Sequence, residues 1–191
     1  LESLGCIAED IGIVPDTADL LLDRLIAIAA EADLIVTSGG ASVGPADYLA
    51  RLITRRGHLE FWQLNMRPGK PAGFGDIDDC PIIALPGNPF AAAAAFHLIG
   101  RVLIAQLSGD GSIFPESLVL PLAEPVRKKA GPLQVLAGKL SRSSGGTTVV
   151  APLDAQGSAN LLAIAGAAVL ILLSEEQEDF VQGEMVEFVF V

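Results

Sequence analysis

Strand-sized apolar runs alternate with helix-sized amphipathic stretches through the first half of the chain. Apolar residues recur at helical spacing over residues 17–32, and a continuous apolar run follows at 33–37. Such alternation is typical of an α/β layer, in which helices cover a mostly parallel sheet. The sequence therefore predicts, in order, a strand at 8–14, a helix at 17–32, a strand at 33–37, a helix at 48–56, strands at 58–65, 72–74 and 81–85, and a helix from 89 to about 107.

The pattern changes after the polar, glycine-rich stretch SGDGS at 108–112, which is typical of a segment that joins domains. Beyond it, turn-rich segments separate strand-sized runs, and this favours a small all-β sandwich or barrel. These runs lie at 118–122, 133–140, 147–151, 167–173 and 186–191. We therefore expect an α/β domain over 1–109 and an all-β domain over 113–191.

Composition narrows the classes of partner. The chain has 191 residues, 51% of them hydrophobic, and a formal net charge of −11. Such a chain can bury a sizeable core, but it has no general attraction for nucleic acid or for anionic membranes. We expect neither as a partner, and any bound anion must be held by local groups. Its two cysteines, Cys6 and Cys80, form no disulfide framework, which favours the cytoplasm.

A bare loop, SGGASVG at 38–44, follows the predicted strand at 33–37. Ligands of open parallel sheets bind at the carboxyl ends of strands. Gly39, Gly40 and Gly44 let the backbone approach a ligand and point N–H groups at an anion, while Ser38 and Ser42 add hydroxyl donors. A tight strand-to-helix turn also needs glycines, so this loop alone leaves both interpretations open.

Two more motifs, LPGNP at 85–89 and RPGKP at 67–71, fall at the same predicted sheet edge. Asn88 is a good N-cap and Pro89 a good first helical residue, and the first turn of a helix attracts anions. The prolines of RPGKP stiffen a turn that displays Arg67 and Lys70. Each motif alone is compatible with an ordinary helix start or a solvated turn. Together with the glycine loop they predict a pocket for a phosphorylated small molecule.

SGGASVGPADY, MRPGKP and LPGNP, in this order and spacing, resemble the C-terminal half of the molybdopterin molybdenumtransferases, the family of MoeA and the gephyrin E domain. The first half resembles the family's three-layer molybdopterin-binding domain, and QGSANLLAIA with GEMVEFVF resembles its small C-terminal β-domain. The resemblance implies molybdenum cofactor biosynthesis: insertion of molybdate into adenylylated molybdopterin (molybdopterin-AMP) with release of AMP. It also implies Mg²⁺, a cytoplasmic homodimer and a molybdopterin adenylyltransferase as a further partner.

The resemblance assigns roles to residues at matching positions. Asp47 and Lys70 would be catalytic, and an ionised Asp47 can hold Mg²⁺ against a phosphoanhydride. Alternatively, Asp47 only caps the helix that begins at Tyr48. Substrate binding is assigned to Ser38, Gly39, Gly40, Ser42, Gly44, Arg67, Pro68, Gly69, Pro71, Pro86, Gly87, Asn88 and Ser158.

The chain departs from the family pattern where hydroxyl or basic donors are expected. Phe90 and Ala91 stand near an expected serine, Lys139 near an expected arginine, and Gln63 at a position where some members have lysine. Three hypotheses stay open: a molybdenum insertase, an adenylyltransferase-like enzyme, and a non-catalytic pterin-binding scaffold. The match begins inside the family's first helix, so we expect the chain to be only part of the active enzyme.

Overall fold

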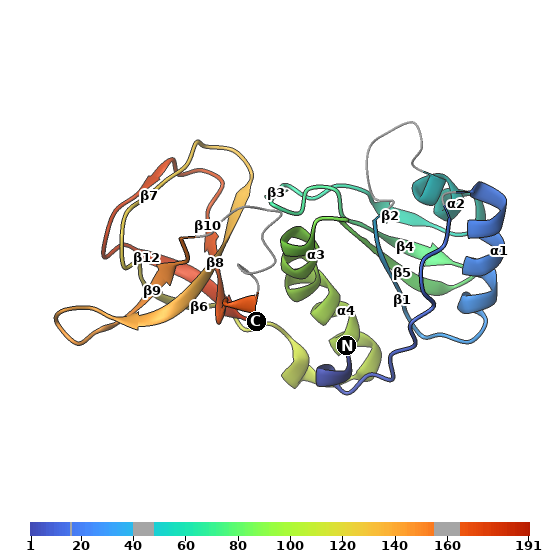
Figure 1. Ribbon diagram of the computed structural model, residues 1–191, viewed down its shortest axis with the longest axis horizontal. Coiled ribbons are helices and arrows are strands. Elements are labelled where there is room, and N and C mark those ends of the chain that lie inside the picture. Colours follow the sequence, from blue (N-terminus) through green and yellow to red (C-terminus); the bar gives the residue numbers. More distant parts are fainter. Residues whose placement is uncertain (16, 40–47, 155–164) are drawn as a thin grey trace. The chain divides into compact units, whose positions relative to one another are not determined.

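The computed structural model describes residues 1–15, 17–39, 48–154 and 165–191. These residues form two compact units, each assembled from three separate segments of the chain (Figure 1). The first unit comprises Leu1–Leu64, Pro71–Gly87 and Ile99–Phe114, and the second comprises Asn65–Lys70, Asn88–Leu98 and Pro115–Val191.

A four-stranded sheet forms the centre of the first unit. Its order is β1 (Ile35–Ser38), β5 (Cys80–Leu85), β4 (Gly73–Ile77) and β2 (Leu59–Phe61). β1 and β5 are parallel, whereas β4 pairs with β5 and with β2 in the antiparallel sense, so the described sheet is mixed where the sequence predicted mostly parallel pairing. The reason is a tight turn at Asp78 and Asp79, whose left-handed φ angles of 50° and 68° let β4 turn directly into β5.

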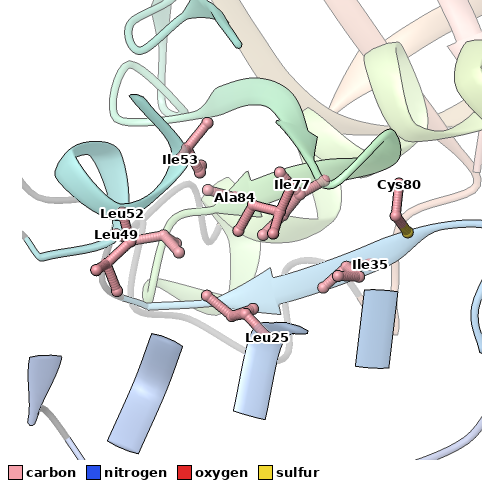
Figure 2. Packing of buried hydrophobic residues seen from close by; sticks show 9 residues of the cluster. Leu25, Ile35, Leu49, Leu52, Ile53, Ile77, Cys80 and Ala84 are labelled. Atoms are coloured by element: carbon pink, nitrogen blue, oxygen red, sulfur yellow. The ribbon is translucent and has the colours of Figure 1, made fainter. Parts of the chain in front are cut away.

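Helices lie on both sides of this sheet. α1 (Ala18–Ala29) and α2 (Tyr48–Arg56) pack on one face, and α4 (Arg101–Ser108) lies on the other (Figure 1). Figure 2 shows Leu25 of α1 and Leu49 and Ile53 of α2 directed at Ile35 of β1 and Ile77 of β4. The α/β class is confirmed, and α2 has the bounds that the sequence predicted.

The first residues contain one short 3-10 turn, η1 (Glu2–Leu4), and then no regular structure up to Pro15. The predicted strand at 8–14 is therefore wrong for this structure. Its backbone finds no ladder partner among the described residues, and a strand requires one.

The apolar helix after LPGNP is continuous but not uniform. α3 (Pro89–Ala95) leads through a π-helical turn, η2 (Phe96–Gly100), into α4, and a short 3-10 turn, η3 (Gly111–Ile113), follows. Residues 89–108 are long and apolar enough to cross a membrane by length and composition alone. This is weak evidence for a span, because core helices pass the same test, and this helix includes buried residues such as Phe90, Ala94 and Ile104.

The second unit is built on strands. Its main sheet has the order β3 (Met66–Arg67), β8 (Leu133–Arg142), β10 (Val169–Leu173), β12 (Met185–Phe190) and β6 (Leu118–Pro121), with β9 (Thr148–Pro152) paired to β8. β7 (Val126–Arg127) and β11 (Asp179–Phe180) form a separate small ribbon. The core gathers side chains such as Leu136, Ile171 and Phe188. The small all-β region that the sequence predicted is confirmed.

Candidate functional site

The carboxyl ends of β1 and β5 form the best-defined part of the candidate site. In the parallel register Ser38 lies opposite Leu85, so both strands end at one edge of the sheet. The Gly39 amide donates to the Leu85 carbonyl at 3.0 Å, and the Ser38 hydroxyl donates to the Pro86 carbonyl at 3.4 Å. The Gly39 N–H is therefore engaged with β5, which corrects the expectation that it points at an anion. Gly39 instead supplies a turn, with a left-handed φ of 89°.

The two loops meet directly beyond these strands. A Cβ atom built on Gly87 would lie 3.6 Å from the Gly39 Cα, which is ordinary van der Waals contact. Pro86 is buried and Gly87 is exposed. The predicted approach of the two motifs is thus present between Gly39 and Gly87, and Gly87 leaves its backbone open to a ligand.

Asn88 caps the helix as the sequence predicted. Its Oδ1 accepts a hydrogen bond from the Ala91 amide at 3.2 Å, and Pro89 occupies the first helical position. Because Pro89 has no N–H and Ala91 serves the cap, the Phe90 N–H is the first-turn donor that neither the helix nor the cap uses. The anion-binding capacity of this helix start is therefore smaller than the motif alone indicates.

The RPGKP motif begins in the second unit. Met66 and Arg67 of β3 pair in parallel with Leu133 and Gln134 of β8. Gly69 has a φ of 112°, and a Cβ there would lie 2.8 Å from the Met66 side chain, so glycine is required at this turn. The side chain of Met66 is buried and lies next to Gly69, where it supports the turn. Pro68 follows Arg67 through a cis peptide bond, and Pro71 opens the next segment of the first unit.

Arg67 and Lys70 are exposed cations. Within the described ranges neither side chain forms an ion pair. In a chain of net charge −11, two unpaired cations on a stiff turn are local positive charge that an anionic ligand can use. They belong to the second unit, whereas Ser38, Gly39 and Gly87 belong to the first.

Several predicted site residues lie outside the described residues. These are Gly40, Ser42, Gly44, Asp47 and Ser158. The alternative interpretation of Asp47, as a cap for α2, therefore also concerns a residue outside the described ranges. Across the described segments, no group of three histidine, cysteine or acidic side chains could hold a metal ion.

Thr37 is a candidate that the sequence reasoning missed. Its Oγ1 is buried and has no hydrogen-bond partner among the described residues, and it lies one residue before Ser38 in β1. A buried hydroxyl without a partner is costly, which marks such an atom as a candidate contact. The signal available in the sequence was a hydroxyl residue inside an apolar strand.

Cys80 lies at the opposite end of β5 from the site. Its buried thiol donates to the Ala32 carbonyl at 3.2 Å, and burial, with a smaller effect of the Asp33 charge, raises its pKa. The thiol therefore stays protonated at neutral pH. We assign it to the core and not to the site.

Two protein families match the chain in succession. A family described as a probable molybdopterin binding domain matches residues 1–106, and a family described as the MoeA C-terminal region (domain IV) matches residues 119–191.

Individual proteins give the same picture. A molybdopterin molybdenumtransferase of Haemophilus influenzae is 33% identical over 187 residues, which cover 97% of this chain and 46% of that protein. Gephyrin of Dictyostelium discoideum is 32% identical over 117 residues, covering 53% of this chain and 16% of gephyrin. The chain thus spans less than half the length of these curated relatives.

Solved structures share the fold. A molybdopterin biosynthesis MoeA protein of Pyrococcus horikoshii matches with a TM-score of 0.71 and 25% identity, over 92% of this chain and 41% of that one. A molybdenum cofactor biosynthesis protein of Pyrococcus furiosus matches with a TM-score of 0.73 and 22% identity, over 95% of this chain and 57% of that one, which shows the fold alone.

Proposed function

The chain belongs to the family of MoeA-type molybdopterin molybdenumtransferases, and from this premise we propose that it forms the pterin-binding part of an enzyme that inserts molybdate into adenylylated molybdopterin and releases AMP. The observation that carries the proposal is the succession of the two family matches along one chain. The match to the MoeA C-terminal region favours this function over that of an adenylyltransferase-like enzyme.

The geometry of the first unit supports a phosphate-binding role for the β1 and β5 ends. Gly39 turns sharply and Gly87 is exposed beside it, so a ligand can approach the backbone closely. We propose that Ser38, Gly39, Pro86 and Gly87 form the wall of the pterin-phosphate site. Asn88 holds the start of α3 in place through its cap to Ala91.

The exposed cations of the second unit support binding of the substrate's negative charges. We propose that Arg67 and Lys70, held on the turn with Pro68, Gly69 and Pro71, neutralise phosphate or molybdate oxygens. A preorganised turn lowers the entropy cost of presenting such charges. Lys70 would act in catalysis by stabilising charge on the reacting phosphate.

Further assignments rest on the family resemblance. We propose that Asp47 holds Mg²⁺, which would offset charge on the phosphoanhydride, and that Gly40, Ser42, Gly44 and Ser158 complete substrate binding. We also propose domains at 1–109 and 113–191, a cytoplasmic homodimer, and delivery of the substrate by a molybdopterin adenylyltransferase.

Anaerobic calorimetric titration of the chain with adenylylated molybdopterin tests the proposal. We expect micromolar binding that an Arg67→Ala/Lys70→Ala variant loses. A matched control, Lys129→Ala/Arg142→Ala, removes the same charge from two exposed residues of the second unit and should bind as the unmodified chain does. Equally weak substrate binding by both variants would show that net charge, and not the RPGKP turn, accounts for the effect. Absence of binding by a folded, unmodified chain would contradict a working site within these residues.

A second measurement separates the scaffold hypothesis. In a chimera in which this chain replaces the matching residues of the Haemophilus influenzae relative, an insertase part should support AMP release at a rate that rises with molybdate concentration. Binding of the substrate by the chimera without molybdate-dependent release would favour a pterin-binding scaffold.

A further inference from the structure

Gln134 is a polar exception in an apolar stretch of β8. It lies in the run LQVLA at 133–137, in which the other four side chains are apolar. Val135, Leu136 and Ala137 are buried, whereas Gln134 is partly exposed. Its side-chain amide has two N–H donors and one carbonyl acceptor, so the neighbours of Gln134 decide what this amide can bind.

The register of β3 and β8 places Arg67 beside this glutamine. β3 runs parallel to β8, and Arg67 lies opposite Gln134. Opposite residues of paired strands extend from the same face of the sheet, and such strands lie about 4.8 Å apart. On the other side of β8, Gln134 lies opposite Leu173, which is buried and apolar. Arg67 is therefore the polar residue that the sheet places next to Gln134.

Neither side chain is engaged within the part of the chain that the structure describes. Arg67 and Gln134 form no side-chain hydrogen bond there, and Arg67 forms no ion pair. A guanidinium group only donates hydrogen bonds, and the nitrogen of a side-chain amide donates as well. Two sets of unused donors on one sheet face, one of them charged, are suited to the oxygen atoms of a single oxyanion.

The backbone holds this pair of residues in place. The Leu133 amide donates to the Asn65 carbonyl at 2.9 Å, directly before the paired positions. Met66, between Asn65 and Arg67, is buried. Arg67 and Gln134 thus extend from a strand pair whose register is fixed, and such preorganisation lowers the entropy cost of binding.

We propose that Gln134 and Arg67 together bind one tetrahedral oxyanion, either a phosphate group or molybdate, with the Gln134 amide as a neutral donor beside the Arg67 charge. This role of Gln134 rests on the proposed function of Arg67 in substrate binding. The neutrality of the amide is essential. A carboxylate at this position would accept hydrogen bonds only, so it would pair with Arg67 and repel the anion.

Nuclear magnetic resonance of the isotope-labelled chain tests the proposal. The probes are inorganic phosphate and molybdate, titrated separately, and the signals are the Gln134 side-chain amide and the Arg67 Nε–H. We expect both signals to shift along one binding curve, and the anion that binds more tightly identifies the ligand group. A shift at Arg67 without a shift at Gln134 at saturating anion would overturn the proposal. So would the absence of any shift with both anions.

Substitutions test the contribution of the amide. Gln134→Leu keeps a similar size but removes the donor, and we expect the anion to bind roughly ten-fold more weakly. Gln134→Glu should weaken binding by a further factor of roughly ten, because it places a carboxylate beside the anion. The control Gln182→Leu removes an exposed glutamine of the second unit and should bind as the unmodified chain does.

Anion binding by Gln134→Leu as tight as that of the unmodified chain would contradict the proposal. If a variant does not fold, the titration of the unmodified chain still decides.

Titration with adenylylated molybdopterin distinguishes the role of Gln134 from the proposed function of the chain. Binding of this pterin without a shift of the Gln134 amide would refute the role of Gln134 and leave the function standing. Joint shifts of Gln134 and Arg67 with the simple anions, in a chain that does not bind the pterin, would support the anion pair and contradict the function.

Discussion

β10 in the second unit and β1 in the first are both apolar strands, but they are placed very differently. β10 pairs with β8 and β12, and Val169, Leu170, Ile171 and Leu173 are fully buried. Among the residues that the structure describes, β1 pairs with β5 alone, borders a cavity, and ends in the exposed Ser38. The two strands are similar in apolar character but differ in role. β10, which is paired on both edges, contributes to stability, whereas β1, which has one open edge, contributes to the candidate site.

The largest expected effect comes from a matched pair of truncations. Ile171→Ala removes a side chain enclosed on all sides and should lower the free energy of unfolding by about 3–5 kcal/mol, the upper part of the range for such changes. Ile35→Ala removes a side chain that already borders the cavity, so the loss should be about 2 kcal/mol. Urea unfolding followed by circular dichroism measures both. Equal losses of unfolding free energy in the two variants would contradict the difference between β10 and β1.

A smaller effect is expected from adding one methyl group. A Cβ on Gly138 of β8 would lie 2.7 Å from Ile171 Cδ1, so Gly138→Ala should cost about 1–3 kcal/mol. Gly87→Ala, with its nearest atom at 3.6 Å, should change stability by no more than about 0.5 kcal/mol.

Combining Gly138→Ala with Ile171→Ala, which deletes both the Cδ1 atom and the Cγ1 atom at 2.9 Å, provides the control. The double variant should be more stable than the sum of the two single changes predicts. Simple additivity would show that the crowding is relieved elsewhere.

Removal of the helix cap at the site end of β5 should lower the stability by an intermediate amount. Asn88→Ala removes the acceptor for the Ala91 amide and should cost about 1 kcal/mol. Asn88→Ser keeps a cap and should recover most of the loss. Thermal unfolding of the three proteins measures this, and identical midpoints for the alanine and serine variants would argue against a capping role.

The other end of β5 gives the smallest effect, and it depends on pH. The folded pKa of Cys80 is raised above its ordinary value of 9.0, so above that pH the unfolded chain loses the thiol proton while the folded chain keeps it. Unfolding then becomes easier as pH rises, with no contribution from this group below about pH 8. Cys80→Ala should remove this part of the decline between pH 8 and 10.

Alkylation with iodoacetamide provides an independent check of the same thiol. Partly exposed Cys6 should react well before buried Cys80. Equal reaction rates at pH 8 would contradict the burial of Cys80.

The sequence predicted local features well where a motif contains its own cause. Asn88 followed by Pro89 defines a helix start, and the structure has the cap in place. The approach of Gly39 and Gly87 followed from two parallel strands ending at one edge.

Features that depend on a distant partner were harder to predict. The strand at 8–14 failed because periodicity shows a tendency to pair and not the presence of a neighbour. The pairing of Met66 and Arg67 with Leu133 and Gln134 joins distant segments, and neither segment signals the other. The acidic turn Asp78–Asp79 did carry a local hairpin signal that the prediction overlooked, and it accounts for the mixed sheet.

The interleaving of the two units along the chain also has a genetic consequence. Because β3 lies before β4 and β5 in the sequence but pairs with β8, a recombination crossover near residue 110 would combine β3 with the β8 strand of a different gene. A gene segment that encodes only the first 110 residues would carry a turn with Arg67 and Lys70 without its β8 neighbour. Exchange of parts between related genes should therefore preserve both units together, and hybrid genes joined at that point should yield poorly folded products.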